Sequence, residues 1–442
     1  MKKHLFKKFL YLNYSRFNKT QKWRQEHITR YGYILIIFLF ITALMGLDIN
    51  KKPSYYVFSI LLSTLIISII SSRFFNSKLM LKRVLPKYGT ANQTLIYDLK
   101  VKNLKNKEEI SIFYKDKFVN SLPSVEEFIN IPEPNERKRN IWDRNLLYYR
   151  WLFLLKKKRN VKTKLIELPR IPANKEIITK IKILPTKRGI LKFELSLLNK
   201  PDIFAMFKGA KYLLNEDKIL ILPQRYLLNS PNLDSRKLNS GLNTEFLSVI
   251  GHGDEFFALR DYRNGDSIKD IHWKSWAKKG KPIVKEYQEH SFFRKALILD
   301  PYSNNEDIFE IAVSLTASYI APLNNKSSNI DKIFINTYSA NIKNNKNQIL
   351  MYLAKLQKKD DNFKFEKIKK NLKTITGTIV ILNNLDNNRI EFLNHLSSLE
   401  IETYIILITN LNSNKGYKKI IKSHKIKVIN INNLEIELKK LQ

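Results

Sequence analysis

The run Tyr31-Gly-Tyr-Ile-Leu-Ile-Ile-Phe-Leu-Phe-Ile-Thr-Ala-Leu-Met-Gly-Leu47 carries no charge and is mostly apolar. A second uncharged run extends from Pro53 to Ser72. At a rise of 1.5 Å per residue, helices of these lengths measure about 26 and 30 Å, close to the ~30 Å hydrocarbon core of a bilayer. Because only Asp48–Lys52 separates the runs, residues 31–72 are expected to form a transmembrane helical hairpin.

Two other interpretations fit these runs less well. A cleaved signal peptide has a short basic start, whereas 30 residues precede the first run and a second run follows it. Two buried helices of a soluble protein would each need a polar face, and neither run has one.

Basic residues near the ends of the runs decide the expected orientation. Nine Lys and Arg residues stand in the first 30 positions against one acidic residue, Glu26, and five more stand between Arg73 and Lys87. Because Lys and Arg favour the cytoplasmic side, both termini and the chain after about residue 73 are expected there. Residues 1–30 would then be a basic cytoplasmic segment.

The chain as a whole is strongly basic, with 78 Lys and Arg against 40 Asp and Glu and a net charge of +38 over 442 residues. This excess fits an anionic partner, either nucleic acid or lipid headgroups. It fits equally a composition rich in Lys, Asn and Ile in which many lysines are solvated surface. The absence of cysteine excludes a disulfide framework, a thiolate zinc site and a cysteine nucleophile.

Familiar catalytic motifs are missing as well. The chain contains no Gly-x-x-x-x-Gly-Lys-[Ser/Thr] phosphate loop, no Gly-x-Ser-x-Gly and no His-Glu-x-x-His. No catalytic residue and no cofactor can therefore be assigned.

Residues 92–223 show an apolar period of two, the pattern of half-buried strands. The runs that show it are Leu95–Val101, Ile110–Tyr114, Ile177–Ile183 and Leu191–Leu197, and Lys218–Leu222 ends the series. Short strands separated by turns predict a small antiparallel β-sandwich, interrupted by an insert at 121–172.

Within the insert, the aromatic and apolar stretch Asn145–Leu155 leads into a basic cluster, Lys156, Lys157, Lys158 and Arg159. The stretch is too short to cross a bilayer as a helix. Trp151 and the basic cluster could lie at the membrane surface. Alternatively, the stretch is a core strand or helix of the sandwich domain, followed by a solvated basic turn.

Residues 283–442 alternate between strand and helix patterns. Strands are expected at Ala296–Asp300, Ile333–Tyr338, Thr378–Leu382, Tyr404–Thr409 and Ile426–Ile429. Helices are expected at Ile308–Tyr319, Gln348–Leu356, Arg389–Leu399 and Leu434–Leu441. This alternation predicts an α/β domain with a parallel sheet, helices on both faces and ligands at the carboxyl ends of the strands.

Residues 253–278, between the two soluble domains, mix charged and aromatic side chains: Arg260, Asp261, Tyr262, Gly265, Asp266, His272, Trp273 and Lys274. Two interpretations stand side by side. The aromatic residues could be buried while Arg260 pairs with Asp266 or Asp261, which would fix the interface between the domains. Alternatively, the charged groups face outward and bind a partner.

The same segment resembles the signature of the family known as domain of unknown function 58. The matching elements are Leu259-Arg-Asp-Tyr262, Gly265-Asp266, Ile271-His-Trp-Lys274 and Ala277. Lys269 and Lys278 depart from the pattern, because the family usually has Arg there. Upstream, Pro201-Asp-Ile-Phe204 loosely resembles the family's Asp-Pro-Phe-Gly element. With the two apolar runs, the resemblance covers nearly the whole chain.

This resemblance implies a bacterial protein that crosses the inner (cytoplasmic) membrane more than once. Its C-terminal domain would be similar to the von Willebrand factor type A fold, which is Rossmann-like. Members are often encoded beside MoxR-type AAA+ ATPases and transglutaminase-like membrane proteins, and their biochemical function is largely unassigned.

Type A domains often hold a divalent cation through Asp-x-Ser-x-Ser after the first strand. The corresponding residues here are Asp300-Pro-Tyr-Ser-Asn304, so Tyr302 and Asn304 replace the two hydroxyl ligands. Asn383 and Asn384 stand where a further acidic ligand would be expected. A site with so few oxygen ligands should bind Mg²⁺ poorly, although Ser303 and Asp386 could substitute.

Three functions remain open. The first is a non-enzymatic interaction module on the cytoplasmic side of the membrane, working with a MoxR-type ATPase. The second is a membrane-associated nucleic-acid-binding protein, although no sequence-specific nucleic-acid motif is present. The third, a hydrolase using Asp261, Asp266 and His272, lacks a nucleophile. The sequence gives no oligomeric state.

Overall fold

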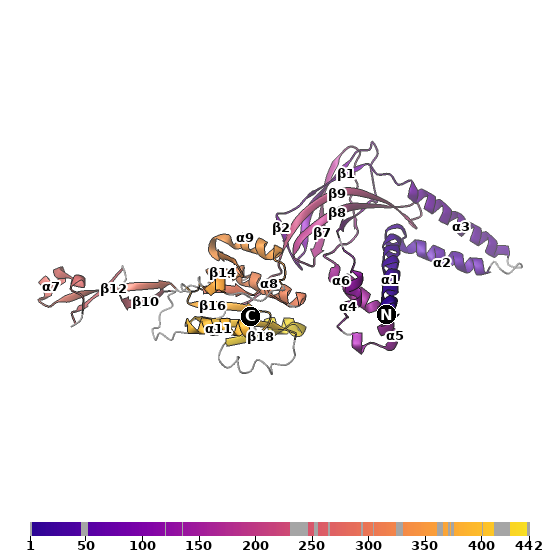
Figure 1. The fold of residues 1–442 in the computed structure, drawn as a ribbon. Helices are drawn as coiled ribbons and strands as arrows, with labels where there is room; N and C mark the ends of the chain where they lie inside the picture. The colour runs from indigo at the N-terminus through magenta and orange to yellow at the C-terminus, as the bar shows by residue number, and fades with distance from the viewer. Residues whose placement is uncertain are drawn as a thin grey trace. The chain divides into compact units, whose positions relative to one another are not determined.

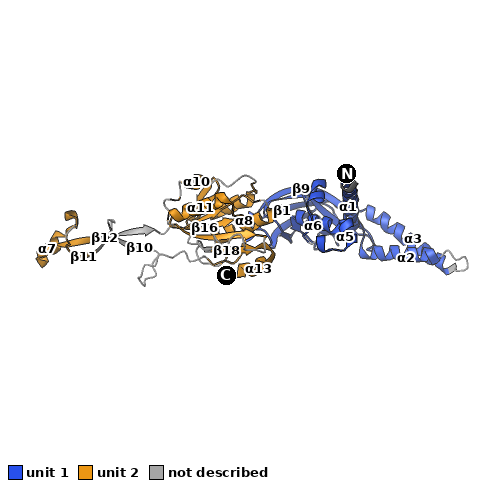
Figure 2. Cartoon of the chain, turned by 60° about the horizontal axis from the view of Figure 1, so that its bottom comes forward, with its two compact units in different colours: residues 1–224 blue, residues 225–442 orange. Residues whose placement is uncertain are grey.

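A computed structural model describes residues 2–439 apart from gaps at 46–51, 120, 135, 230–245, 252–254, 264–265, 293–294, 304, 324–329, 360–365, 370–371, 373–374, 400 and 411–424. The chain divides into two compact units, residues 1–224 and 225–442 (Figures 1 and 2). Both units contain helices and sheets, so the fold is mixed α/β with several separate sheets.

Three helices begin the first unit: α1 (Lys2–His27), α2 (Arg30–Met45) and α3 (Lys52–Arg73). Helices α2 and α3 pack side by side (Figure 1), and most of their apolar side chains remain exposed. Among the described helices, α3 alone is long and apolar enough, over Pro53–Arg73, to cross a membrane, whereas α2 is apolar but shorter. Most of the expected connection, Asp48–Lys52, lies outside the described residues.

Two sheets form the body of this unit, with strand orders β1-β3-β7-β5 and β2-β9-β8-β4-β6. The strands are β1 (Leu79–Val84), β2 (Tyr88–Thr90), β3 (Leu95–Asn103), β4 (Phe113–Phe118), β5 (Val161–Lys162), β6 (Ile166–Glu167), β7 (Glu176–Pro185), β8 (Gly189–Pro201) and β9 (Lys208–Leu222). All pairs are antiparallel except β2 with β9. The domain therefore begins before residue 92, because β1 and β2 belong to these sheets.

The two sheets share one apolar core. Leu99 and Val101 of one sheet pack in the same buried cluster as Tyr114 and Phe193 of the other. Successive strand residues point to opposite faces, which explains why the alternating pattern of the sequence located most of these strands.

A charged group also lies in this core. The guanidinium of Arg83, on β1, donates to Asp116 over 2.7 and 2.9 Å and to Asp217 over 2.9 Å. Asp116 also accepts hydrogen bonds from the hydroxyls of Tyr97 and Tyr114. A buried arginine and its carboxylate are tolerated when both are fully hydrogen-bonded, as they are here.

The described residues of the insert form the short helices α4 (Val125–Asn130), η1 (Glu136–Lys138), α5 (Ile141–Leu146) and α6 (Tyr148–Lys158), followed by β5 and β6, which belong to the two sheets. Helix α1 packs against α4 and α6. Residues 1–30, expected only as a basic segment, thus contribute a helix that covers the insert. The one acidic residue among them, Glu26, binds Lys117 over 3.0 Å and accepts a hydrogen bond from Tyr212 over 2.7 Å.

The second unit contains a small antiparallel sheet of order β10-β12-β11, formed by β10 (Phe246–Gly251), β11 (Glu255–Asp261) and β12 (Ile283–Phe292). Between β11 and β12 come the helices η2 (Ile268–Asp270) and α7 (Trp273–Lys279). Gly280 ends α7 with a φ of 69°, a left-handed conformation that glycine adopts without strain.

A six-stranded sheet follows, with the order β15-β14-β13-β16-β17-β18. Its strands are β13 (Lys295–Leu299), β14 (Lys332–Ile335), β15 (Tyr338–Asn341), β16 (Gly377–Leu382), β17 (Glu402–Thr409) and β18 (Lys425–Asn430). Its helices are α8 (Glu306–Ile320), α9 (Ile342–Lys355), α10 (Glu366–Lys369), α11 (Asn387–Ser398), η5 (Ile431–Asn433) and α13 (Leu434–Lys439).

Neighbouring strands of this sheet are parallel, except that β14 and β15 form an antiparallel hairpin. The single strand expected at 333–338 is therefore wrong, because the chain turns at Asn336, which has a φ of 52°. Helix α11 contributes Phe392 and Leu393 to the core on one face, and α8 lies on the other (Figure 1). The alternation of strand and helix predicted this arrangement.

Candidate functional site

The segment singled out by the sequence folds around one ion pair. The guanidinium of Arg260 donates to both carboxylate oxygens of Asp266, over 2.6 and 2.7 Å. The backbone N–H of Arg263 donates to the same carboxylate over 2.7 Å. These hydrogen bonds lower the pKa of Asp266 to about 2. Both side chains keep some solvent exposure, so the pair fixes the loop without being a buried charge.

Helix α7 presents its first tryptophan to solvent. Trp273 is 61% exposed, and its ring stacks on Trp276 with centroids 5.2 Å apart and 17° between the ring planes. Ile271, in contrast, is buried and bridges to Val284 on β12. The interpretation in which the aromatic residues are buried is therefore wrong for Trp273, although Ile271, two residues before it, is buried.

The other predicted residues lie around this helix start. The backbone N–H of His272 donates to the Ile283 carbonyl over 2.8 Å, and its Nδ1 lies 2.6 Å from the Ser275 hydroxyl oxygen. Asp261 and Lys274 are exposed and Tyr262 is half-buried. Gly253, where the segment begins, and Gly265 lie outside the described residues.

These contacts do not assemble a reaction centre. Asp266 is held by Arg260, whereas His272 contacts Ser275, so the two do not act as one acid–base pair. Within the described ranges, no cluster of three or more His, Cys, Asp or Glu side chains could hold a metal ion.

The second predicted site, around Asp300, is filled by an arginine. Asp300 is fully buried, and Nε of Arg389 donates to its carboxylate over 2.7 Å. Another guanidinium nitrogen of Arg389 pairs with Asp386. Asn383 donates from Nδ2 to the backbone carbonyls of Asp300 and Tyr302, over 2.8 and 3.1 Å.

The guanidinium therefore lies between two carboxylates, where a bound cation would otherwise balance their charge. Burial raises the pKa of Asp300, and Arg389 opposes that rise. Ser303, considered as a substitute ligand, donates instead to the Asn305 carbonyl over 2.9 Å, and Asn304 lies outside the described residues. The role of Arg389 leaves no local trace in the sequence, because 89 residues separate it from Asp300.

Trp151, predicted to lie at the membrane surface, is buried inside the protein instead. Its side chain is only 2% exposed and meets the ring of Tyr11, on α1, edge to face at 5.7 Å. Trp151 as a membrane-surface residue is therefore wrong, because α1 covers it. In the basic cluster, Lys158 binds Glu127 over 2.6 Å, Lys157 is half-buried, and Lys156 and Arg159 are exposed.

The alternative of a core helix followed by a basic turn holds in part, because the stretch is helical and buried but packs outside the sandwich core, and Lys156, Lys157 and Lys158 belong to the helix. Residues 148–158 form α6, whose apolar side is buried in a small core of Leu10, Phe128, Leu147, Trp151 and Leu154. The sequence could not decide this, because part of the core comes from α1, and its Leu10 lies more than 130 positions before α6 in the chain.

The two apolar helices contact the loop between β8 and β9 and the start of β9. The Thr29 N–H donates to the Met206 carbonyl over 3.0 Å, directly before α2 begins. A Cβ at Gly32 would collide with the same carbonyl, and a Cβ at Gly209 would lie 2.6 Å from the carbonyl oxygen of Ser72, near the end of α3. Both close approaches therefore require glycine.

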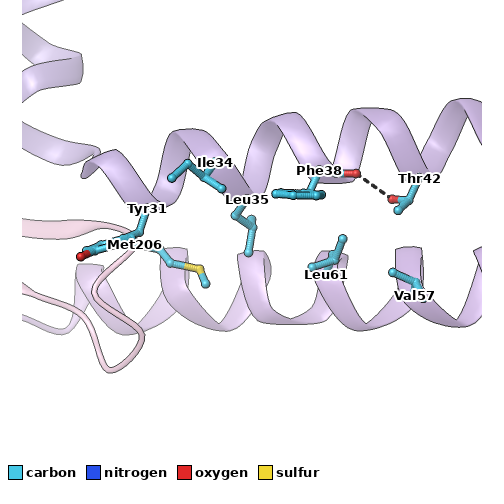
Figure 3. A pocket seen from close by; sticks show the side chains of 8 residues that line it. All are labelled: Tyr31, Ile34, Leu35, Phe38, Thr42, Val57, Leu61 and Met206. Carbon is cyan, nitrogen blue, oxygen red and sulfur yellow. Dashed lines mark hydrogen bonds between the residues drawn. The ribbon is translucent and has the colours of Figure 1, made fainter.

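An apolar groove of about 370 Å³ lies between α2 and α3 (Figure 3). Tyr31, Leu35 and Phe38 line it from α2, and Val57 and Leu61 from α3. The Met206 side chain lies at one end of the groove (Figure 3). This lining is suited to lipid acyl chains or apolar side chains rather than to a polar substrate.

Comparisons with known proteins add little to this picture. No family model and no curated protein matches the chain. A CARDB domain from Pyrococcus furiosus has 10% identity over 32% of this chain and 93% of its own, with a TM-score of 0.18. A β-glucosidase from Listeria innocua has 10% identity over 33% of this chain and 16% of its own, with a TM-score of 0.17.

A sporulation control protein from Bacillus subtilis has 9% identity over 33% of this chain and 50% of its own, with a TM-score of 0.15. Scores this low carry no argument about fold or function, so both must be argued from the chain itself.

Proposed function

We propose that this chain is a membrane-anchored, non-enzymatic interaction module similar to the domain of unknown function 58 family. In this proposal α2 and α3 form a transmembrane hairpin in a bacterial inner membrane, and the soluble parts face the cytoplasm. The apolar, exposed surfaces of the two helices and the basic residues that flank them support the anchoring. The six-stranded sheet of 295–430 supports a domain similar to the von Willebrand factor type A fold.

The observation that carries the proposed interaction is the exposure of Trp273 on a segment held by its own ion pair. Trp and Arg are enriched among the residues that dominate binding energy at protein interfaces. Trp273 and Lys274 begin α7, a short helix that follows the loop held by Arg260 and Asp266, so the exposed Trp can bind a partner with little loss of conformational freedom.

The partner we propose is a MoxR-type AAA+ ATPase, with a transglutaminase-like membrane protein as a further member of the assembly. Both come from the family resemblance. The buried Arg389, which balances Asp300 and Asp386, supports an interaction that needs no divalent cation in the C-terminal domain.

Co-purification with the detergent-solubilised full chain tests this proposal. Wild-type protein should retain the ATPase, and Trp273→Ala should weaken retention by roughly 30-fold or more, the effect of losing a ~2 kcal/mol hot spot. Trp142→Ala is the matched control, because Trp142 is also highly exposed but lies on α5. Its retention should equal that of the wild type.

Two results would contradict the proposal. Equal retention by Trp273→Ala and wild type would remove the segment as the docking surface. Retention of arbitrary DNA or RNA that falls steeply with salt, without an ATPase, would instead indicate the nucleic-acid function that the net charge of +38 also fits.

A further inference from the structure

The loop between β8 and β9, residues 202–207, is built to display apolar side chains. Asp202 is buried and accepts hydrogen bonds from the backbone N–H groups of Phe207, over 2.7 Å, and Phe204, over 3.2 Å. Ala205 has a φ of 55°, which completes a tight turn. The polar residue of the loop therefore points inward, while Ile203 is 80% exposed and Phe204 is 41% exposed.

This display is unusual for a surface turn. Turns are normally occupied by Gly, Asn, Asp, Ser and Pro, and a large apolar residue at 80% exposure gains nothing from the folded core. The sequence Pro201-Asp-Ile-Phe204 resembles a family element, but the interaction module proposed above gives these residues no role.

The loop lies next to the two apolar helices, which indicates the surface that its exposed side chains contact. It contacts the start of α2 through the hydrogen bond from Thr29 to Met206, and the adjoining Gly209 lies against the end of α3. Phe74, directly after α3, is also 80% exposed. Ile203, Phe204 and Phe74 thus belong to the place where one apolar helix begins and the other ends.

The charges at this place fit a lipid surface as well. Arg30 and Arg73, the terminal residues of α2 and α3 on this side, are both exposed. The acidic groups nearby are already engaged: Asp202 binds backbone N–H groups, and Glu109 binds Lys105 and Lys200 over 2.6 and 3.1 Å. Exposed arginines beside apolar tips match anionic headgroups above an acyl layer.

We propose that the 202–207 loop inserts Ile203 and Phe204 into the interfacial layer of an anionic bilayer, the same one that α2 and α3 enter. This inference rests on the membrane anchoring proposed above. It assigns the membrane-surface contact to the β8–β9 loop instead of to residues 145–159, whose Trp151 is covered by α1. The insertion would set the distance and tilt of the β-sheets relative to the bilayer.

The test uses the absence of cysteine from the chain, so that one introduced cysteine carries one spin label. The full-length variants Ile203→Cys and Phe204→Cys are labelled with a nitroxide and placed in nanodiscs containing anionic phospholipid. Collisions with oxygen, which partitions into lipid, are compared with collisions with a water-soluble nickel complex. Both labels should show a several-fold higher oxygen-to-nickel ratio than a label in water.

Two control positions calibrate this measurement. Phe40→Cys, on the exposed surface of α2, reports whether the helices are in the bilayer. Ile190→Cys replaces a residue that is 54% exposed near the start of β8, the strand that leads into the loop. It is eleven residues from Pro201, roughly 36 Å along an extended strand, so its label should report water.

The outcomes separate the inference from the anchoring on which it rests. Lipid-like ratios at Phe40, Ile203 and Phe204, with a water-like ratio at Ile190, support the insertion. A lipid-like ratio at Phe40 with water-like ratios at both loop positions overturns the insertion and leaves the anchor standing. Loop labels shielded from both reagents also overturn it, because a protein then covers the loop. A water-like ratio at Phe40 removes both proposals.

Discussion

At the scale of single residues, Arg389 supplies the positive charge between two carboxylates of the C-terminal domain. It balances a fully buried carboxylate, Asp300, and pairs with Asp386, the residue that caps the start of its helix. An arginine has a permanent charge and needs no supply from solution, whereas a cation site fills or empties with concentration. The positive charge between Asp300 and Asp386 is therefore present at every cation concentration.

Replacing this arginine should show how much it stabilises the folded domain. We expect Arg389→Ala to lower the free energy of unfolding by ~3–5 kcal/mol, because it leaves Asp300 buried without its ion pair. Asn388→Ala, the exposed neighbour on the same helix, should have little effect. Thermal unfolding of the detergent-solubilised full chain measures both changes.

Magnesium distinguishes a structural arginine from one that substitutes for a metal. Millimolar Mg²⁺ should leave the melting temperature of the wild type unchanged and should raise that of Arg389→Ala, because the emptied position lies between two carboxylates. A rise in the wild type, or a fall on adding EDTA, would show that a cation binds despite the arginine.

At the scale of elements, the loop before α7 depends on the protonation state of Asp266. Its pKa is about 2 in the folded chain, against an ordinary value of 3.8, because Arg260 and the Arg263 N–H hydrogen-bond the carboxylate. A depressed pKa means that the stabilisation is complete above pH 3.8 and is lost as the pH falls through about 2. The loop should thus keep its conformation at every physiological pH.

A carboxyl ¹³C titration of the full chain, with Asp266→Asn used to assign the signal, measures this pKa. We expect a midpoint near 2. A midpoint near 3.8 would mean that Arg260 does not hold the carboxylate in solution.

The elements differ in how well the sequence predicted them. Strands β3, β7 and β8 followed from strict alternation, and β13 and β16 from short apolar runs, because burial on one or both faces leaves a direct trace in the pattern. Strand β1 was missed because Arg83 was counted as a flanking charge, although it points into the core.

The site residues were harder to predict for a related reason. The pairing of Arg260 with Asp266 or Asp261 was one of two interpretations of the segment, and Asp266, six residues after Arg260, is the partner. The exposure of Trp273 was not expected, because an aromatic side chain is usually buried. The covering of Trp151 depends on Tyr11, which lies far away in the sequence.

At the scale of the whole molecule, the arrangement of the N-terminal helices constrains the topology. Helix α1 packs on the insert, and the β8–β9 loop is fastened to the start of α2. The sheets and the N-terminus must therefore lie on the same side of any bilayer that α2 and α3 enter. An odd number of crossings between residue 27 and residue 79 would separate partners that are in contact.

Reporter insertions on the two sides of the hairpin test this topology. A reporter that is active only outside the cytoplasm should be active when inserted between Asp48 and Pro53, and inactive when fused after Gln442. The basic residues on both flanks of the hairpin give the physical reason, because Lys and Arg resist translocation. An active fusion after Gln442 would place the sheets outside. Since α1 is bound to them, the nine basic residues of the first 30 would then have crossed as well, and the orientation argued from charge would fail entirely.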